Sequence, residues 1–405
     1  MSGRFPSITR ALFRPLTIST ILLLTLSSNS HFILGSARSQ GSTVADVIVW
    51  PSARADHAMA YDGQSDRIIL FGGHTSGGPN GETWAYDLNP NTWTNMQPAA
   101  SPPDRANHAM AYDAGSDRII LFGGWPGYAD TWAYDFKNNT WTNKAPSAAP
   151  STRWDHRMAY DAQSDRVILY AGHDSSGGSD VQYSDTWTYD YDANAWSNLD
   201  PSPKPSGIGQ YELAYDTASD RIIHFGGRVP SLIGSDGTWS YDTDANSWTE
   251  RNASSRPPSR MEHAMAYDAE SDRIIMFGGA AGTVGGGIGP VFNDAWAYDF
   301  NTNVWTRMNT PTSPSGRQAH RMVYDTESDR VVMFGGSLSS REQDASSYNN
   351  EVWAYDSNTN VWNRKMPSTG PAGGLPPVLV GATITVVIAA AGAAGAILLR
   401  RRRKQ

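Results

Sequence analysis

The chain of 405 residues contains no cysteine. This absence excludes disulfide scaffolds, thiolate zinc sites, iron–sulfur clusters and cysteine nucleophiles. The zinc-peptidase helix motif, the serine-hydrolase elbow and the phosphate-binding loop are missing as well. We therefore expect no metal site and no cofactor, and no residue can be named as catalytic. Whether the protein is an enzyme stays open at this point.

Basic residues are scarce in the body of the chain. All 40 acidic residues lie between Asp46 and Asp356, whereas eight of the 32 basic residues lie at the two ends. Residues 38–370 therefore carry 24 basic against 40 acidic residues. Such a body repels a phosphate backbone, so we expect no nucleic-acid partner. Aromatic residues are plentiful instead, with 15 Trp and 18 Tyr, and a chain of this kind buries enough surface to fold.

The N-terminus has the pattern of a secretory signal. Three arginines precede an apolar run at 16–26, and small residues follow it up to Ala37. A charged head, a short apolar middle and small residues at the cut are typical of a cleaved leader. We predict a signal peptide over 1–37 with cleavage after Ala37. The alternative is an uncleaved anchor over 16–35, which is just long enough to span a bilayer.

The C-terminus has the pattern of a membrane anchor. Residues 378–399 carry no charge and are long enough to cross a hydrocarbon core of about 30 Å. A basic tail at 400–405 follows at once, and the positive-inside rule places it in the cytoplasm. We predict a single-pass type I cell-membrane protein with a Pro/Gly linker over 367–377 and an extracellular body. The alternative is cell-wall sorting at 366–370, which resembles a sortase signal but begins with Met instead of Leu.

The body between these ends consists of six copies of one unit. The unit follows the pattern R-x-x-H-A-M-A-Y-D, then S-D-R, an apolar run, a Gly-Gly step, and T-W-x-Y-D followed by a further Trp, with single positions replaced in individual copies. A period near fifty residues is a repeat signature, and each unit predicts four short antiparallel strands. The Gly-Gly steps, or their equivalent, fall at Gly72/Gly73, Gly123/Gly124, Ala171/Gly172, Gly226/Gly227, Gly278/Gly279 and Gly335/Gly336.

This unit resembles the Kelch family of β-propellers over residues 54–366, with 38–53 as a lead-in. The resemblance rests on the Gly-Gly step, the Tyr-Asp pair after it and the Trp that opens the fourth strand. That Trp occurs as Trp93, Trp141, Trp196, Trp248, Trp305 and Trp362. The resemblance implies an all-β fold, a six-bladed Kelch-type propeller with four antiparallel strands per blade, to which the C-terminal transmembrane helix is added. Residues 47–50 are expected to add a strand that helps close the ring.

Strand connectivity assigns the loops of the propeller to two faces. The links between strands one and two, and between three and four, are short and nearly uniform. The links between strands two and three vary from 8 to 17 residues, counted from the second Gly to the Trp, and are longest in blades 3, 5 and 6. Variable loops on a rigid scaffold carry recognition. We therefore place the binding surface on this second face, called the loop face.

Five arginines occupy one repeat position at the start of the blades, each followed three residues later by His. Resemblance to Kelch proteins implies that arginines here surround the channel mouth and hold carboxylates. Their forks suit such groups. The alternative is an identical hydrogen bond inside each blade, because the residue recurs in five of six units. The candidates are Arg54, Arg105, Arg153, Arg260 and Arg317.

Blade 4 breaks this pattern, and two inner positions change elsewhere. Ile208 replaces the arginine and Tyr211 the histidine, with Glu212 next to it. In blades 3 and 6, Arg157 and Arg321 stand where other blades have alanine after the histidine. Broken symmetry in a repeat protein marks either the ligand side or the drift of one blade. Tyr211 and Glu212 are therefore candidate ligand-binding residues.

Three aromatic residues lie outside the repeat frame, in the expected upper loops of blades 2 and 3. They are Trp125, Tyr128 and Trp154. Trp and Tyr are favoured anchors in protein interfaces, and sugar rings stack on them as well. Trp125 and Trp154 therefore join the candidate binding residues.

Three functional hypotheses follow. The first is a membrane-anchored recognition module that binds an extracellular protein or glycan through the loop face. The second is an extracytoplasmic sugar isomerase or hydrolase at the channel mouth, for which no specific residue pair is present. The third is a structural surface-layer or adhesion component. The copper-radical oxidase activity of some Kelch-like propellers is excluded, because its cofactor requires a cysteine that this chain lacks.

Overall fold

The computed structural model describes residues 50–206, 209–229, 234–282, 288–340 and 344–366. The predicted signal peptide (1–37), linker (367–377), transmembrane segment (378–399) and basic tail (400–405) lie outside these ranges. Within the described ranges no helix has the length and apolar character needed to cross a membrane. Membrane anchoring therefore stays a prediction.

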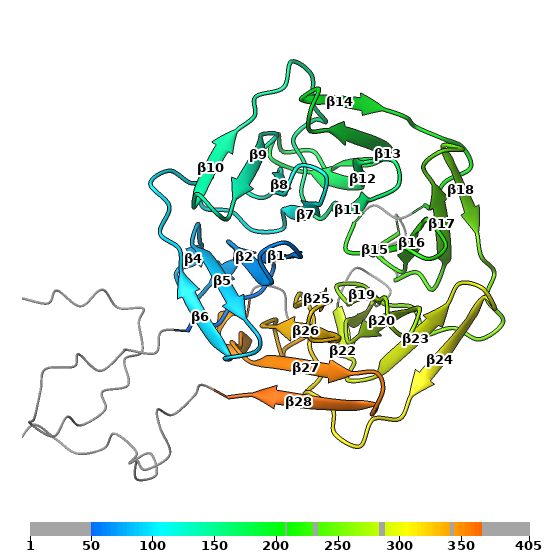
Figure 1. Cartoon of the computed structure of the whole chain (residues 1–405). Helices are drawn as coiled ribbons and strands as arrows, with labels where there is room; N and C mark the ends of the chain where they lie inside the picture. The colour runs from blue at the N-terminus through cyan, green and yellow to red at the C-terminus, as the bar shows by residue number, and fades with distance from the viewer. Residues whose placement is uncertain (1–49, 207–208, 230–233, 283–287, 341–343, 367–405) are drawn as a thin grey trace, which may run out of the picture. The chain divides into compact units, whose positions relative to one another are not determined.

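Six four-stranded antiparallel sheets surround a central axis, which confirms the predicted six-bladed propeller (Figure 1). From the axis outward, the blades are β1 Ala58–Asp62, β2 Arg67–Phe71, β5 Thr83–Asp87, β6 Thr92–Asn95; β7 Ala109–Asp113, β8 Arg118–Phe122, β9 Thr131–Asp135, β10 Thr140–Asn143; β11 Arg157–Asp161, β12 Arg166–Asp174, β13 Val181–Asp190, β14 Ala195–Asn198; β15 Glu212–Asp216, β16 Arg221–Phe225, β17 Thr238–Asp242, β18 Ser247–Glu250; β19 Ala264–Asp268, β20 Arg273–Phe277, β23 Ala295–Asp299, β24 Val304–Met308; and β25 Arg321–Asp325, β26 Arg330–Phe334, β27 Val352–Asp356, β28 Val361–Lys365.

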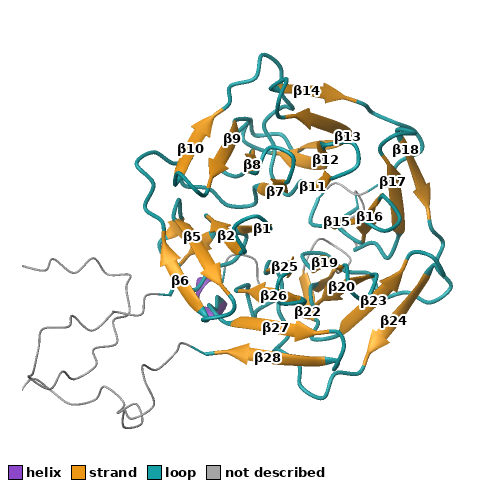
Figure 2. Cartoon of the chain, viewed as in Figure 1, coloured by secondary structure: helices purple, strands orange, loops and turns teal. Residues whose placement is uncertain are grey.

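The links between the second and third strands carry the little additional secondary structure of the described ranges. Blade 1 has the hairpin β3 (His74–Thr75) with β4 (Gly78–Pro79), and blade 5 has β21 (Ala280–Gly282) with β22 (Ile288–Val291). The link of blade 6 contains a single 3-10 turn, η1 (Ala345–Ser347), drawn in purple in Figure 2.

The second strand of each blade is apolar on both faces because a blade has a neighbour on each side. Ile119 and Leu121 of blade 2 pack in one cluster with Phe71 of blade 1. The alternate residues Ile120 and Phe122 pack in the next cluster, with blade 3. A β-strand points successive side chains to opposite faces, so the continuous apolar run fills two inter-blade cores at once.

The ring closes by packing of blade 6 against blade 1, and each blade takes its four strands from one continuous stretch of chain. Strand β1 contacts β7 on one side and β25 on the other. Phe334 of blade 6 packs on Trp93 of blade 1, with ring centroids 5.0 Å apart. The strand expected at 47–50 is not formed at Trp50, which packs partly buried against this cluster, and residues 47–49 lie outside the described ranges.

The fourth-strand tryptophans also join neighbouring blades by hydrogen bonds. The Nε1–H of Trp141 donates to the Thr83 hydroxyl of the preceding blade at 3.0 Å, and the same bond recurs from Trp196, Trp248 and Trp305. Blade 6 carries Val352 at the threonine position, so Trp93 Nε1, which faces it in blade 1, is buried without a partner among the described residues.

Val352→Thr is therefore expected to stabilise the propeller by about 1 kcal/mol, the usual net value of a hydrogen bond, because its hydroxyl restores a bond that four other blade pairs make. Urea unfolding of the full chain, followed by tryptophan fluorescence, measures the change. The matched control is Val331→Thr, which buries the same hydroxyl at 1% exposure inside strand β26. This control is expected to destabilise the protein, and an equal loss in both variants would contradict the prediction.

Candidate functional site

Each of the five repeat arginines is fully buried at the end of its own blade, with no exposed surface. In blade 2, Arg105 donates from Nε to the Pro103 carbonyl (3.0 Å) and from Nη1 to the Gly123 carbonyl (2.9 Å). Both terminal nitrogens also bind the Asp130 carboxylate, at 2.6 and 2.8 Å. One guanidinium thus ties the lead-in, the second strand and the approach to the third strand together. We call this set of contacts the arginine clamp.

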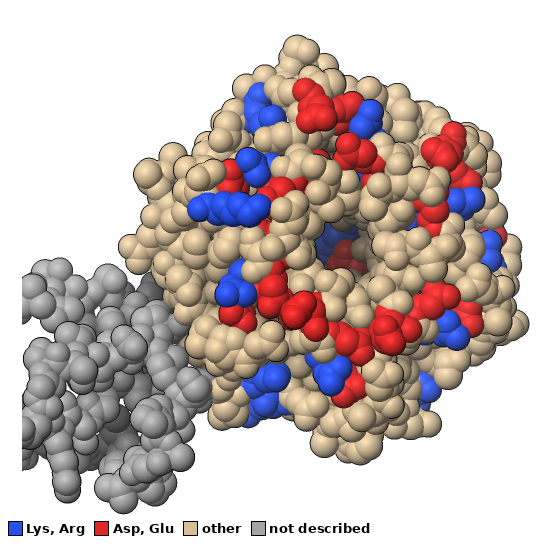
Figure 3. Space-filling view, viewed as in Figure 1, with Lys and Arg blue, Asp and Glu red and all other residues tan. Residues whose placement is uncertain are grey.

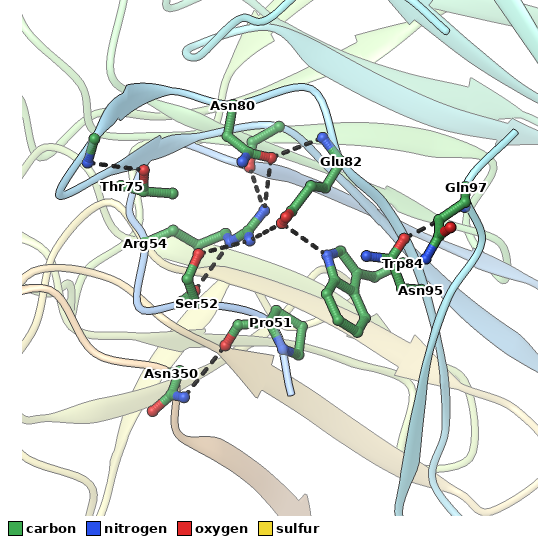
Figure 4. A network of polar contacts seen from close by, with 12 residues as sticks. Pro51, Ser52, Arg54, Thr75, Asn80, Glu82, Trp84, Asn95, Gln97 and Asn350 are labelled. Carbon is green, nitrogen blue, oxygen red and sulfur yellow. Dashed lines mark hydrogen bonds and ion pairs between the residues drawn. The ribbon is translucent and has the colours of Figure 1, made fainter. Parts of the chain in front are cut away.

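The acidic half of each arginine clamp lies two residues before the third-strand tryptophan. Figure 4 shows the clamp of blade 1, where Arg54 binds Glu82 at 2.6 Å and Trp84 donates its indole N–H to the same carboxylate at 3.0 Å. The other carboxylates are those of Asp130, Asp185, Asp294 and Glu351. Blade 4 has neither half, because its sequence carries Ile208 and Gly237 at the two positions.

The charge of the clamp is balanced inside the blade. Burial by itself would raise the pKa of Asp130, but the hydrogen bonds and charge of Arg105 outweigh burial and hold this pKa below its usual value. The same balance lowers the pKa of Glu351 opposite Arg317. The ring of Tyr128 covers the Arg105 guanidinium at 4.2 Å. Tyr128 therefore contributes to the clamp, in addition to its place in an upper loop.

The Gly-Gly step exists because the next blade's arginine backbone approaches it closely. The N–H of Gly73 donates to the Arg105 carbonyl at 2.9 Å. A Cβ on Gly72, whose φ is +68°, would lie 2.6 Å from the same carbonyl oxygen, which a side chain cannot occupy. The one alanine at this position, Ala171, precedes blade 4, whose arginine is replaced by Ile208.

These contacts support the second of the two interpretations of the arginines, an identical hydrogen-bond set within each blade. A direct ligand role for Arg54, Arg105, Arg153, Arg260 and Arg317 stays a prediction, and their side chains offer no exposed surface for it.

The channel mouth is formed by the residue two positions after each arginine. Successive members donate backbone N–H groups to the carbonyl of the previous blade's member, so six hydrogen bonds of 2.8–3.3 Å close a circle around the axis. Each member has a left-handed backbone with φ of 55–58°. We call this set the mouth ring: Asp56, Asn107, Asp155, Gln210, Glu262 and Ala319.

The mouth ring lines a cavity of about 140 Å³ on the loop face. Trp125, Arg228 and Tyr348 come to it from the links between second and third strands. His173 comes from the end of the long second strand β12, and Trp154 from the start of blade 3. The two kinds of segment that the strand connectivity places on one face therefore meet at this cavity. Three members of the mouth ring contribute carboxylates to the lining of this cavity: Asp56, Asp155 and Glu262.

Two of the predicted binding residues lie at this cavity. Trp125 is half-buried and packs on His74, with ring centroids 5.4 Å apart. Trp154 is 7% exposed and packs edge-on against His173 at 5.1 Å. Asn107 and His173 approach the two carboxylate oxygens of Asp155, at 2.8 and 3.4 Å.

Tyr211 and Glu212 lie deeper, on the inner side of blade 4. Tyr211 is fully buried, donates its hydroxyl to the Tyr170 carbonyl and accepts the backbone N–H of Arg157 at 3.2 Å. Glu212 pairs with Arg157 at 3.2 Å. The structure therefore separates the nine candidates into buried clamps, two aromatic residues at the cavity and one inner pair.

Sequence reasoning missed the mouth ring and the acidic half of the clamp. Both left a signal in the repeat alignment. The mouth ring is the second of two variable positions between the repeated Arg and His, and it is polar in five of the six blades. The clamp acid recurs as Asp or Glu two residues before Trp in the five blades that have the arginine. The joint loss of both clamp partners in blade 4 marks them as a pair.

Comparison with known proteins agrees with this architecture. The sequence profile of the KLHDC2/KLHL20/DRC7 Kelch-repeats domain matches residues 27–227 and 212–388. The chain belongs to this Kelch-repeat family, and a Kelch propeller suggests a protein-binding module.

Two curated relatives match over shorter shares of their own length. Mei4-dependent protein 6 of Schizosaccharomyces pombe is 29% identical over 117 residues, which is 28% of this chain and 16% of the relative. The flagellar outer-arm dynein alpha chain of Chlamydomonas reinhardtii is 26% identical over 305 residues, which is 71% of this chain and 5% of the relative. The matched stretches thus span a small part of either relative.

Proposed function

We propose that this propeller is a membrane-anchored recognition module that binds an extracellular protein through the cavity on its loop face. The observation that carries the proposal is that the variable loops of several blades converge on one cavity at the mouth of the channel. Trp125, Arg228 and Tyr348 come from three different blades and line it together. Aromatic and arginine side chains around a central cavity are the residues that anchor protein interfaces.

The extracellular location rests on the sequence at the two ends. A leader over 1–37 and an anchor over 378–399 with a basic tail would hold the propeller outside the membrane. A glycan partner is the narrower alternative, favoured by the aromatic rings of Trp125 and Trp154 at the cavity.

Photo-cross-linking in the source cells tests the proposal. In one variant a photoreactive amino acid replaces Arg228, which lines the cavity. In the control it replaces Lys137, which lies in the turn between strands β9 and β10 on the opposite face and has 59% of its side chain exposed. We expect a protein adduct from position 228 and none from position 137. Cell-surface biotinylation of the same cells checks the location.

Affinity measurements with the cross-linked protein complete the test. Arg228→Glu and Tyr348→Ala are expected to weaken binding by about tenfold or more, as for anchor residues in other interfaces, whereas Lys137→Glu leaves it unchanged. Equal adducts from both faces, or unchanged affinity in the cavity variants, would overturn the proposal. Saturable binding on a glycan array without any protein adduct would favour the glycan alternative.

A further inference from the structure

One position on the innermost strands differs in character between the blades. It is the first residue after the repeated His, two residues beyond the mouth ring. Blades 1, 2 and 5 have alanine there, at Ala58, Ala109 and Ala264. Blades 3, 4 and 6 have Arg157, Glu212 and Arg321, which are 5%, 8% and 8% exposed. Burying three ionisable groups at one level of the channel is costly unless each charge is paired and hydrogen-bonded.

The two arginines face each other across the channel. The inner strands follow one another around the axis in the order β1, β7, β11, β15, β19, β25, so blades 3 and 6 are opposite. Even so, the charge of Arg157 acts on Arg321, and burial together with this repulsion lowers the pKa of Arg321 to about 10. Figure 3 shows a central hollow on the axis with both basic and acidic atoms inside it.

The hydrogen bonds of the two arginines differ. Arg157 donates from Nε to Glu212 at 3.2 Å and from Nη1 to the His156 carbonyl at 2.9 Å. Arg321 donates from Nη1 to the His320 carbonyl at 2.8 Å, but its Nη2 is buried without a hydrogen-bond partner among the described residues. This position on the inner strands therefore carries two guanidinium charges and one carboxylate. The two N–H groups of Arg321 Nη2 have no acceptor among the described residues.

Other carboxylates act on Arg321 through their charge but do not accept from its Nη2 among the described residues. Glu212 on the same level, and Asp56 and Glu262 of the mouth ring above it, each raise the pKa of Arg321. Asp56 approaches His74 at 3.4 Å and Glu262 accepts from Gln210 at 2.9 Å. The neighbouring His57 and His320 are buried, and burial lowers the pKa of each well below its usual value, so they are neutral at physiological pH.

We propose that the central channel binds a small oxyanion, a carboxylate or a phosphate, through Arg321, with Arg157 as the second cation. A guanidinium fork binds two oxygens of one such group, and it does so more strongly in a dry site than on a surface. The site lies beneath the cavity on the loop face and goes beyond the proposed protein-binding role, because it needs no macromolecular partner.

Thermal unfolding of the full-length chain with sodium acetate or sodium phosphate tests the site. Sodium chloride at the same ionic strength is the reference. We expect a saturable rise in Tm with one oxyanion beyond the chloride reference, as for any ligand that binds only the folded state. The preference for acetate or phosphate then identifies the ligand class.

Two variants make the result specific. Arg321→Ala installs the residue that blades 1, 2 and 5 carry, so it is expected to fold, to be at least as stable as the parent in chloride, and to bind the oxyanion about tenfold more weakly or worse. Arg307→Ala removes an exposed arginine of β24 and is expected to keep the full response. Three results would overturn the site: no oxyanion response in the parent, an equal response in Arg321→Ala, or a lower stability of Arg321→Ala in chloride.

Discussion

Replacing Arg105 by methionine is expected to lower the free energy of unfolding by about 3 kcal/mol, because it breaks a buried ion pair by removing one partner. Methionine fills a similar volume, but the Gly123 carbonyl and the Asp130 carboxylate lose their donors. Asp130 keeps 23% of its side-chain surface exposed, so the loss is at the lower end for such pairs. Urea unfolding of the full chain at pH 7.5 measures it.

A double-mutant cycle with Asp130→Leu separates the clamp from general packing. Arg105→Met and Asp130→Leu are expected to couple by about 2 kcal/mol. Each substitution alone leaves the other residue without its ion-pair partner, whereas the double variant removes both partners together. Arg307→Met, at an exposed position, is the control and should stay within about 0.5 kcal/mol of the parent. If Arg105 were held for a ligand instead of the fold, Arg105→Met would also leave stability unchanged, and that result would contradict the clamp.

The fold could be predicted because its determinants recur. The second strand of every blade, such as β8, is apolar on both faces because each blade packs against two neighbours. The Gly-Gly step meets the carbonyl of the next blade's arginine wherever the next blade has that arginine. Six repetitions of one weak local pattern amount to a strong signal. The predicted six blades with four antiparallel strands each are the consequence.

The site could be predicted only in outline, because its decisive contacts join residues that are distant in sequence. Connectivity indicated the face on which Trp125 and Trp154 lie. It did not show that Arg105 would be covered by Tyr128 and bound by Asp130, 25 residues away. A repeated arginine at the mouth of a channel is compatible both with ligand binding and with a structural role. The residues that it contacts in the fold distinguish these two roles. The mouth ring is difficult to recognise from the sequence, because its members differ chemically and share only a backbone conformation.

Acidification from pH 7.5 to about 5 is expected to unfold the propeller, with a midpoint well above that of ordinary carboxylate-driven acid denaturation. Five repeated histidines are buried, and burial, followed by the charge of nearby arginines, lowers the pKa of each well below its usual value. Burial also lowers the pKa of His224 to about 3. All six are therefore neutral when folded and take up a proton near pH 6.5 when unfolded.

The sign follows from this difference in proton binding. Above pH 6.5 neither state binds these protons and the stability is complete. Below pH 6.5 the unfolded state binds up to six more protons, which costs about 1.4 kcal/mol per histidine and pH unit, or about 8 kcal/mol per unit for the set. The clamp acids, such as Asp130 with its lowered pKa, lose their contribution only as the pH falls below about 4. The histidine window therefore comes first.

His224→Leu is the matched control for this mechanism. The other blades have Leu70, Leu121, Leu169, Met276 and Met333 at this position, so leucine fits the local packing. The slope of unfolding free energy against pH, from urea titrations between pH 7.5 and 5.5, should fall by about one sixth in this variant. A parent protein whose stability is flat over that interval would show that the buried histidines accept protons in the folded state. The inter-blade cores around them would then be open to water, contrary to the dry packing that their burial implies.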